Sequence, residues 1–295
     1  YLPQLKAINM NENLANKVCL ITGATNGIGE ESAKELNKMG AEIVFIARNE
    51  EKGNKLKAEL FAASGREATM ILANLSSQAE VKRAAEEFLS LEKPLDILLN
   101  NAGIMNRERK ETVDGLEEVF SVNHLAYFTF TLMLVEKLKQ TKGARVVNVA
   151  SGAHQFVKDM NFDDLQSEKV FKPMQVYGQS KLANILFTKS LAEKLSEHDV
   201  TVNCLHPGFV STGIGSNNNK TLWTLLMFLA KPFARKTDKG AETSIYLCCS
   251  PEVENLSGEY FVDCKVEKVS AAAKSSEQAA KLWQISTDIT GLKLY

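Results

Sequence analysis

Two side chains in the second half of the chain have types and a spacing that suit proton transfer. Tyr177 and Lys181 are four residues apart in VYGQSKLAN (176–184), so a helix would place both on one side. An unperturbed phenol has a pKa of about 10, which is too high for good proton exchange near neutrality. A nearby ammonium stabilises the phenolate, so Lys181 is expected to lower the pKa of Tyr177. The same spacing is common on solvated helix surfaces, and other segments must decide between the two interpretations.

A glycine-rich turn, TGATNGIG (22–29), lies near the start of the chain. It follows a short apolar run and precedes a helical pattern. Glycines permit a tight turn and close backbone approach, and the N-terminus of the following helix favours a pyrophosphate. The spacing is G-x-x-x-G-x-G rather than G-x-G-x-x-G, but the strand-turn-helix context predicts a dinucleotide site. The residues predicted to bind the cofactor in this turn are Gly23, Thr25, Asn26, Gly27, Ile28 and Gly29.

Arg48 directly follows the next apolar run, 41–47. An acidic residue at this point would accept a hydrogen bond from a ribose 2′-OH, whereas a guanidinium pairs with a 2′-phosphate. Arg48 therefore predicts NADP(H) as the cofactor. Glu50 and Glu51 lie close by, and a solvated position at a helix start is the alternative interpretation of Arg48.

Small or polar residues also follow the later apolar runs. NNAG (100–103), Ser151 beside Gly152, and HPGFVST (206–212) each stand just after such a run. In a parallel sheet, ligands bind beyond the carboxyl ends of the strands, so these loops are predicted to line one cleft. The cofactor-binding residues predicted in these loops are Asn101, Ala102, Gly103, Pro207, Gly208, Val210 and Thr212.

The elements that must position these residues alternate between strand and helix. Nearly continuous apolar runs suit strands that are covered on both faces. Seven such runs are predicted strands: 17–22, 41–47, 67–75, 95–103, 144–151, 200–208 and 258–263. The segments between them predict helices at 29–39, 49–63, 77–91, 115–138 and 175–196. The predicted fold is α/β: a single doubly wound (Rossmann) domain at 17–295, with a mostly parallel seven-stranded sheet and helices on both faces.

The composition argues against several other classes of function. The chain has 295 residues, of which 44% are hydrophobic, and its net charge of -1 offers no nucleic-acid surface. The five cysteines form no C-x-x-C and the four histidines show no ligand spacing, so neither a metal site nor disulfides are expected. Reduced thiols are typical of an intracellular compartment.

No apolar run is expected to reach the ~20 residues that span a bilayer, and 222–230 is the nearest to that length. Residues 1–16 are interpreted as an N-terminal extension. Because the given chain opens at Tyr1, an anchor upstream, in the endoplasmic reticulum or a mitochondrion, is left open. The expected location is cytoplasmic or membrane-associated.

Taken together, these motifs resemble the classical short-chain dehydrogenase/reductase superfamily. The resemblance rests on TGATNGIG, NNAG, Asn123, Ser151, Tyr177-x-x-x-Lys181 and Pro207-Gly208, in that order along the chain. Within the superfamily, SKLANILFTKSLAEKL (180–195), KGAETSIYL (239–247) and SGEYFVDC (257–264) resemble the retinol dehydrogenase branch, as does the tail at 279–292. The resemblance implies an NADP(H)-dependent oxidoreductase that interconverts an apolar aldehyde or ketone and its alcohol.

The resemblance also implies roles for single residues. The catalytic set would be Asn123, Ser151, Tyr177 and Lys181. Tyr177 would exchange a proton with the substrate oxygen, to which Ser151 would hydrogen-bond. Tyr177 and Lys181 would also bind the cofactor, Lys181 through the nicotinamide ribose, and Asn123 would support a water relay to solvent. The cofactor itself supplies the hydride.

Other residues near these motifs depart from the superfamily pattern or are expected to have no catalytic role. Asn74, with Leu75 beside it, stands where the superfamily often has Asp near the adenine, and an amide can still hydrogen-bond there. Ser180 is interpreted as structural, and His154 and His206 as ordinary loop residues.

The segment 212–236 is predicted to be an apolar lid over the substrate. It contains Trp223 and Phe228 and few charges before Lys231. A buried helix is the alternative interpretation, and a peripheral membrane contact would suit a lipid substrate. The resemblance implies retinal/retinol or another lipid aldehyde as substrate.

Other functions and one assembly state remain open. A steroid or other carbonyl reductase, a porphyrin-type reductase of the same superfamily, and a non-catalytic NADP(H) sensor are the alternatives. The apolar faces of the helices that carry Asn123 and Tyr177 suit a homodimer contact, but they suit the core of a monomer too.

Overall fold

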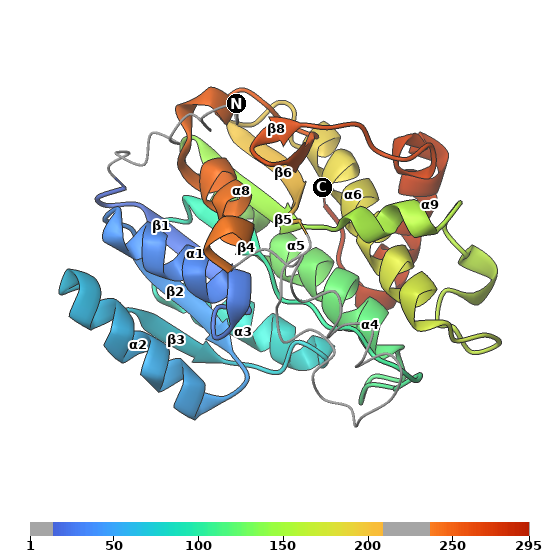
Figure 1. Ribbon diagram of the computed structural model, residues 1–295, viewed down its shortest axis with the longest axis horizontal. Helices are drawn as coiled ribbons and strands as arrows, with labels where there is room; N and C mark the ends of the chain where they lie inside the picture. The colour runs from blue at the N-terminus through green and yellow to red at the C-terminus, as the bar shows by residue number, and fades with distance from the viewer. Residues whose placement is uncertain (1–13, 209–236, 295) are drawn as a thin grey trace, which may run out of the picture.

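One eight-stranded sheet forms the centre of the computed structural model, in the order β3-β2-β1-β4-β5-β6-β7-β8 (Figure 1). The structure describes residues 14–208 and 237–294. The predicted lid at 212–236, Val210, Thr212 and most of the predicted extension at 1–16 lie outside these residues. The strands are β1 (Val18–Thr22), β2 (Glu42–Ala47), β3 (Thr69–Leu72), β4 (Ile97–Asn100), β5 (Ala144–Val149), β6 (Val200–His206), β7 (Tyr260–Val262) and β8 (Lys265–Val266).

The sheet is parallel from β3 to β7, and β8 pairs antiparallel with β7. Every residue of β1 and β4 is buried, as expected for strands covered on both faces. The α/β prediction is confirmed, but the sheet has eight strands where seven were predicted. The sequence analysis missed β8 because it has two exposed residues, which are too few to form an apolar run.

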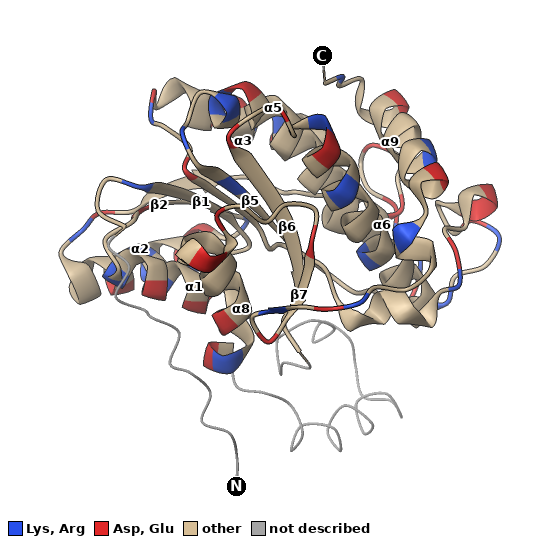
Figure 2. Ribbon diagram, turned by 90° about the horizontal axis from the view of Figure 1, so that it is seen from above, with Lys and Arg blue, Asp and Glu red and all other residues tan. Residues whose placement is uncertain are grey.

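Helices cover both faces of the sheet (Figure 2). Helices α1, α2 and α8 lie on one face, and α3, α5 and α6 lie on the other. The helices are α1 (Gly27–Lys38), α2 (Glu50–Ser64), α3 (Gln78–Ser90), α4 (Glu118–Phe120), α5 (Ala126–Lys139), α6 (Pro173–Lys194), α8 (Thr237–Cys249) and α9 (Ser276–Thr290). The short helical turns are η1 (Ser121–Leu125), η2 (Gly152–Phe156), η3 (Phe162–Asp164), η5 (Pro251–Val253) and η6 (Ala272–Lys274).

The predicted helices appear within a few residues of their expected positions, with one interruption. The helix predicted at 115–138 is divided by η1, a π-helical turn, into α4 and α5. The helix predicted at 175–196 begins at Pro173, because proline suits the first position of a helix, where no N–H donor is needed.

The strand order changes direction at β1, which has β2 on one side and β4 on the other. The chain therefore leaves the carboxyl ends of β1 and β4 toward opposite faces of the sheet. Such a switch point opens a crevice in which doubly wound folds bind ligands. The glycine-rich turn and the NNAG loop both stand there.

One helical stretch among the described residues, Glu118–Lys139, is long and apolar enough to cross a membrane by length and composition. The sequence analysis expected no run of this length. However, 89% of the most apolar window of this stretch is buried inside the fold, as in the core helix of a soluble protein.

The C-terminal helix α9 packs along α6 (Figure 2). Trp283 of α9 stacks on Phe187 of α6, with ring centroids 5.9 Å apart, and meets Phe128 of α5 edge-on at 5.1 Å. The chain's own C-terminus thus covers part of the apolar surface that was considered for a homodimer. A homodimer stays a prediction.

Candidate active site

The glycine-rich turn after β1 touches the NNAG loop after β4. Gly23 has φ +68°, and a Cβ added to it would lie 2.8 Å from Cα of Ala102. A Cβ added to Gly29 would lie 2.3 Å from Nδ2 of Asn101. Both positions therefore need glycine for this close approach.

Hydrogen bonds lock the same two segments together. The Asn101 side chain donates to the carbonyls of Thr22 and Gly23, each at 3.0 Å. The Thr22 hydroxyl accepts from the backbone N–H groups of Asn101 (2.9 Å) and Ala102 (3.1 Å). The buried hydroxyl of Tyr127 donates to the carbonyl of Ala102 at 2.7 Å. Thr22 and Tyr127 were not among the predicted residues, although Tyr127 stands one helical turn after Asn123.

These segments fit a dinucleotide. Asn26, the residue before α1, makes no side-chain cap, so its side chain leaves the first N–H groups of that helix open. Open N–H groups and the helix dipole favour a pyrophosphate. Glycine at positions 23 and 29 lets this turn pack directly against the NNAG loop. Thr25, Asn26, Gly27 and Ile28 would line this end of the cofactor, as predicted from the sequence.

Arg48 and Asn74 stand at the neighbouring strand ends. Thr22 pairs with Ile46, so Arg48, which is exposed, lies just beyond the strand next to the glycine-rich turn. Asn74 is partly buried beside Leu75. Its amide oxygen accepts from the N–H of Ser76 at 3.2 Å.

Tyr177 and Lys181 lie on α6, and their side chains are neighbours. Nζ of Lys181 is 5.7 Å from the centre of the Tyr177 ring and 5.9 Å from that of Tyr127. The same Nζ donates a hydrogen bond to the carbonyl of Val149 at 2.9 Å. A Cβ added to Gly103 would lie 3.5 Å from this Nζ, so the ammonium also borders the NNAG loop.

The pKa values of this pair differ from the expectation. Burial lowers the pKa of Lys181 to about 7. Burial raises the pKa of Tyr177 to about 12, although its hydrogen bond with Ser151 works in the opposite direction. The expected lowering of the phenol pKa by Lys181 is therefore wrong for the protein alone. Removal from water disfavours the charged form of each group. The Lys181 ammonium also donates its hydrogen bond to the carbonyl of Val149 rather than to the phenol.

Ser151 follows β5 and faces the same pair. Its hydroxyl accepts from the N–H of Ala153 at 3.2 Å. A Cβ added to Gly178, which follows Tyr177, would lie 2.8 Å from the carbonyl oxygen of Ala153. Gly178 therefore lets α6 approach the Ser151 turn closely enough for the two hydroxyls to meet.

Asn123 lies inside the π-helical turn η1, and its amide links two other segments. Nδ2 donates to the carbonyl of Ile104 (2.9 Å) and to the hydroxyl of Ser180 (3.0 Å), while Oδ1 accepts from the N–H of Ile104 (2.8 Å). Ser180 in turn donates to the carbonyl of Tyr177 at 2.8 Å. Asn123 thus ties the NNAG loop to α6, and its part in a water relay stays a prediction. Ser180 is the structural link between them.

His154 is not the ordinary loop residue that the sequence suggested. It is completely buried in η2, with Nδ1 2.8 Å from the carbonyl oxygen of Ser151. Its Nε2 accepts from the N–H of Ser270 at 3.3 Å. Ser270 is 116 residues away along the chain, so local sequence could not reveal this bond.

The last predicted site residues lie at the end of β6 and directly after it. A Cβ added to Gly152 would lie 3.1 Å from Nε2 of His206, so His206 fills the space beside the Ser151 turn. Pro207 and Gly208 follow at once, with Gly208 at φ +81°. Val210 and Thr212 are outside the described residues.

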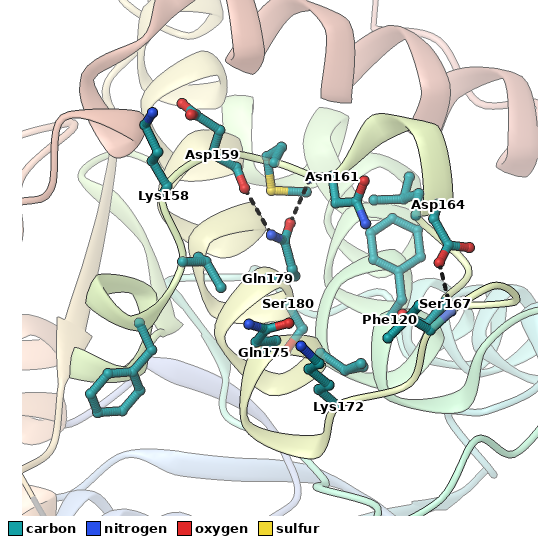
Figure 3. Close-up of a pocket in the computed structure, with 16 residues that line it drawn as sticks. Phe120, Lys158, Asp159, Asn161, Asp164, Ser167, Lys172, Gln175, Gln179 and Ser180 are labelled. Atoms are coloured by element: carbon teal, nitrogen blue, oxygen red, sulfur yellow. Dashed lines mark hydrogen bonds between the residues drawn. The ribbon is translucent and has the colours of Figure 1, made fainter.

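A cavity of about 490 Å³ lies against another flank of α6 (Figure 3). Gln179 points into the region, donating to the carbonyl of Asp159 (2.8 Å) and accepting from the N–H of Asn161 (3.0 Å). Ser180 lines this cavity, but Tyr177 and Ser151 do not. The proton-transfer groups therefore face a different side of the helix.

The arrangement suits oxidation or reduction at a carbonyl carbon. The Tyr177 phenol and the Ser151 hydroxyl meet near the carboxyl ends of the strands that carry the glycine-rich turn and the NNAG loop, and both can contact one substrate oxygen there. A bound nicotinamide would supply or accept the hydride. Among the described residues, no group of three or more His, Cys, Asp or Glu side chains could hold a metal ion.

Comparisons with known proteins agree with this chemistry. The short chain dehydrogenase family model matches residues 17–223. Mouse "Retinol dehydrogenase 12" is 40% identical over 284 residues, which cover 96% of this chain and 89% of that protein.

Solved structures share the fold. An uncharacterized protein from Mycobacterium Paratuberculosis has a TM-score of 0.77 at 28% identity, covering 96% of this chain and 97% of its own. A short chain dehydrogenase from Burkholderia cenocepacia J2315, in complex with NADP, has a TM-score of 0.69 at 25% identity, covering 89% and 100%. The chain therefore belongs to the short-chain dehydrogenase family, in its retinol dehydrogenase branch, and is an oxidoreductase of CH–OH and C=O groups that uses a nicotinamide cofactor.

Proposed function

We propose that this enzyme uses NADP(H) to reduce an apolar aldehyde, retinal or another lipid aldehyde, to its alcohol. The observation that carries the cofactor choice is the place of Arg48, exposed just beyond β2 and beside the glycine-rich turn. A guanidinium there suits a 2′-phosphate. The NADP bound to the Burkholderia cenocepacia relative supports the same choice. The substrate class is supported by relatives named retinol dehydrogenases.

The protonation states of the site suit reduction. Because its pKa is about 12, Tyr177 keeps its proton in the resting enzyme. When a hydride reaches the carbonyl carbon, the oxygen becomes strongly basic and takes the phenol proton. Ser151, already hydrogen-bonded to Tyr177, would donate to the same oxygen and hold it in line.

Lys181 would then stabilise the phenolate that remains. Its ammonium lies 5.7 Å from the phenol ring, and a pKa of about 7 allows both charge states near neutrality. The positive form attracts the phenolate, and this attraction is strong where water is excluded. The charged form of Lys181 would therefore lower the energetic cost of proton transfer from Tyr177 to the substrate oxygen.

A substrate and cofactor screen tests the proposal. Steady-state rates are measured with retinal, a medium-chain aldehyde and a keto-steroid, each with NADPH and with NADH. We expect the highest kcat/KM with retinal or the lipid-like aldehyde and NADPH. Highest efficiency with the keto-steroid would assign a steroid reductase, and equal rates with NADH would remove the role given to Arg48.

A further inference from the structure

We propose that the C-terminal segment 270–290 positions the catalytic turns of this enzyme through two buried histidines, His124 beside Asn123 and His154 beside Ser151. The inference rests on the catalytic roles of Asn123 and Ser151 but not on the choice of NADPH or of retinal. The segment lies beyond residues 17–223, which the family model matches.

The first link joins α9 to the turn that carries Asn123. His124 follows Asn123 in η1 and is 1% exposed. Its Nε2 lies 2.9 Å from the hydroxyl oxygen of Ser286, which is completely buried in α9. The two residues are 162 positions apart, so this bond fastens the end of the chain to its middle.

Aromatic rings hold His124 in one orientation. The imidazole packs 5.2 Å from Phe120 and meets Phe187 edge-on at 6.1 Å. Trp283, one helical turn before Ser286, packs on Phe187 from the α9 side. A ring confined on several sides transmits the position of α9 to the backbone of η1.

The position of η1 matters because a π-helical turn is an irregular insertion in a helix, often found at functional sites. From this turn Asn123 makes its three amide hydrogen bonds, two with Ile104 and one with Ser180. If η1 relaxes, Asn123 moves relative to α6, which carries Tyr177. His124 and Ser286 are thus positioning residues that need not touch substrate or cofactor.

The second link joins the same segment to the turn that carries Ser151. His154 contacts the Ser151 carbonyl through Nδ1 (2.8 Å) and accepts from the N–H of Ser270 through Nε2 (3.3 Å). A single neutral tautomer, with the proton on Nδ1, satisfies both bonds. Tyr260 of β7 packs edge-on against this ring at 5.2 Å.

Both imidazoles are suited to fixed contacts. Burial lowers the pKa of His124 to about 3 and also lowers that of His154. Each ring therefore stays neutral near pH 7, as the acceptor role of His154 requires. The segment adds further attachments near the same turns, since Gln278 accepts from the N–H of Met160 at 2.7 Å.

Paired variants of α9 test the first link. Ser286→Ala removes the hydroxyl that meets His124, and Ser286→Thr restores one. Thr287→Val is the matched control, because the neighbouring hydroxyl is buried and has no hydrogen-bond partner in the described part of the chain. We expect Ser286→Ala to lower kcat about tenfold at unchanged cofactor KM, with Thr restoring it and Thr287→Val having no effect.

His154→Asn tests the second link. The Asn amide can still donate to the Ser151 carbonyl, but it is too short to reach Ser270. We expect kcat to fall as for Ser286→Ala. A wild-type kcat in both His154→Asn and Ser286→Ala would overturn the proposal. So would an equal loss of kcat in Ser286→Ala and Thr287→Val that parallels a fall in the Tm of each variant.

The readout does not depend on the identity of the substrate. Rates are measured with whichever aldehyde and nicotinamide the wild-type enzyme turns over. Hydrogen exchange gives a second measure, which needs no turnover. Ser286→Ala should speed exchange in residues 118–128, and His154→Asn should do so in 150–156. Unchanged exchange in both peptides would contradict the proposal.

Discussion

Nζ of Lys181 lies 5.7 Å from the centre of the Tyr177 ring while it donates a hydrogen bond to the carbonyl of Val149 at 2.9 Å. The ammonium is thus close to the phenol, but its hydrogen bond goes to a backbone carbonyl. In the protein alone, burial is therefore the main influence on both pKa values: it raises that of Tyr177 and lowers that of Lys181. An ion pair between the two groups would shift each pKa in the opposite direction.

Raising the pH from 7 toward 10.5 should reduce the destabilisation that Lys181 causes. Its folded pKa is about 7 and its ordinary value is 10.5, so in this window the unfolded chain binds a proton that the folded protein lacks. Stability rises with pH wherever the unfolded state binds more protons. Below pH 7 both states are charged and this contribution is constant.

Urea unfolding of the wild type and of Lys181→Met measures the effect. The methionine variant should have the higher free energy of unfolding at pH 7, and its advantage should shrink as the pH rises. Taking the difference between the two proteins removes the contribution of buried cysteines and tyrosines. An advantage that does not change with pH would contradict the pKa of Lys181.

Tyr177→Phe should lower kcat by about 10²- to 10⁴-fold, the range in which general acid catalysis contributes. The Kd for NADPH should stay unchanged, because the crevice keeps its glycine-rich turn and its NNAG loop. Tyr246→Phe is the control, since Tyr246 lies in α8 and its hydroxyl donates to Glu252 of η5 at 2.9 Å, away from Tyr177. Retained turnover in Tyr177→Phe would contradict the role of Tyr177 as the general acid. Retained cellular output without turnover would indicate a non-catalytic NADP(H) sensor.

Gly29→Ala should weaken cofactor binding at least about tenfold, equivalent to ~1.4 kcal/mol. The new Cβ would lie 2.3 Å from Nδ2 of Asn101 and 2.4 Å from the carbonyl oxygen of Gly23, so the turn must open. Fluorescence titration with NADPH measures the Kd.

Gly65→Ala is the control for that titration. Gly65 ends α2 with φ +70° and has no atom within 4 Å of an added Cβ. We expect a loss of stability of about 1 kcal/mol from backbone strain and an unchanged Kd. Equal Kd changes in the two variants would show that the turn does not hold the cofactor.

Arg48→Ser should reduce the preference for NADPH over NADH by roughly 10- to 100-fold, since a charge-assisted hydrogen bond contributes about 1.5–3 kcal/mol. The ratio of kcat/KM values for the two cofactors is the measurement. Arg66→Ser, at an exposed position beyond the other end of α2, should leave that ratio unchanged. An Arg48→Ser enzyme with the wild-type ratio would assign Arg48 to the solvated helix start.

Much of the site could be predicted because parallel strands bring their carboxyl ends to one edge. The glycine-rich turn and the NNAG loop were placed at that edge from apolar runs alone, and Gly23 does touch Ala102. The anchoring bonds of Thr22 and Tyr127 were missed, since nothing in the local sequence shows where a hydroxyl points. β8 was missed because a strand of two exposed residues leaves no hydrophobic pattern.

The order of strands and helices, the turn that needs glycine and the residues after each strand were determined by the sequence, because hydrophobic period and backbone sterics are local. The tertiary structure alone decided the partners of His124 and His154, which are 162 and 116 residues away. It also decided the pKa values of Tyr177 and Lys181, because burial depends on how distant segments pack.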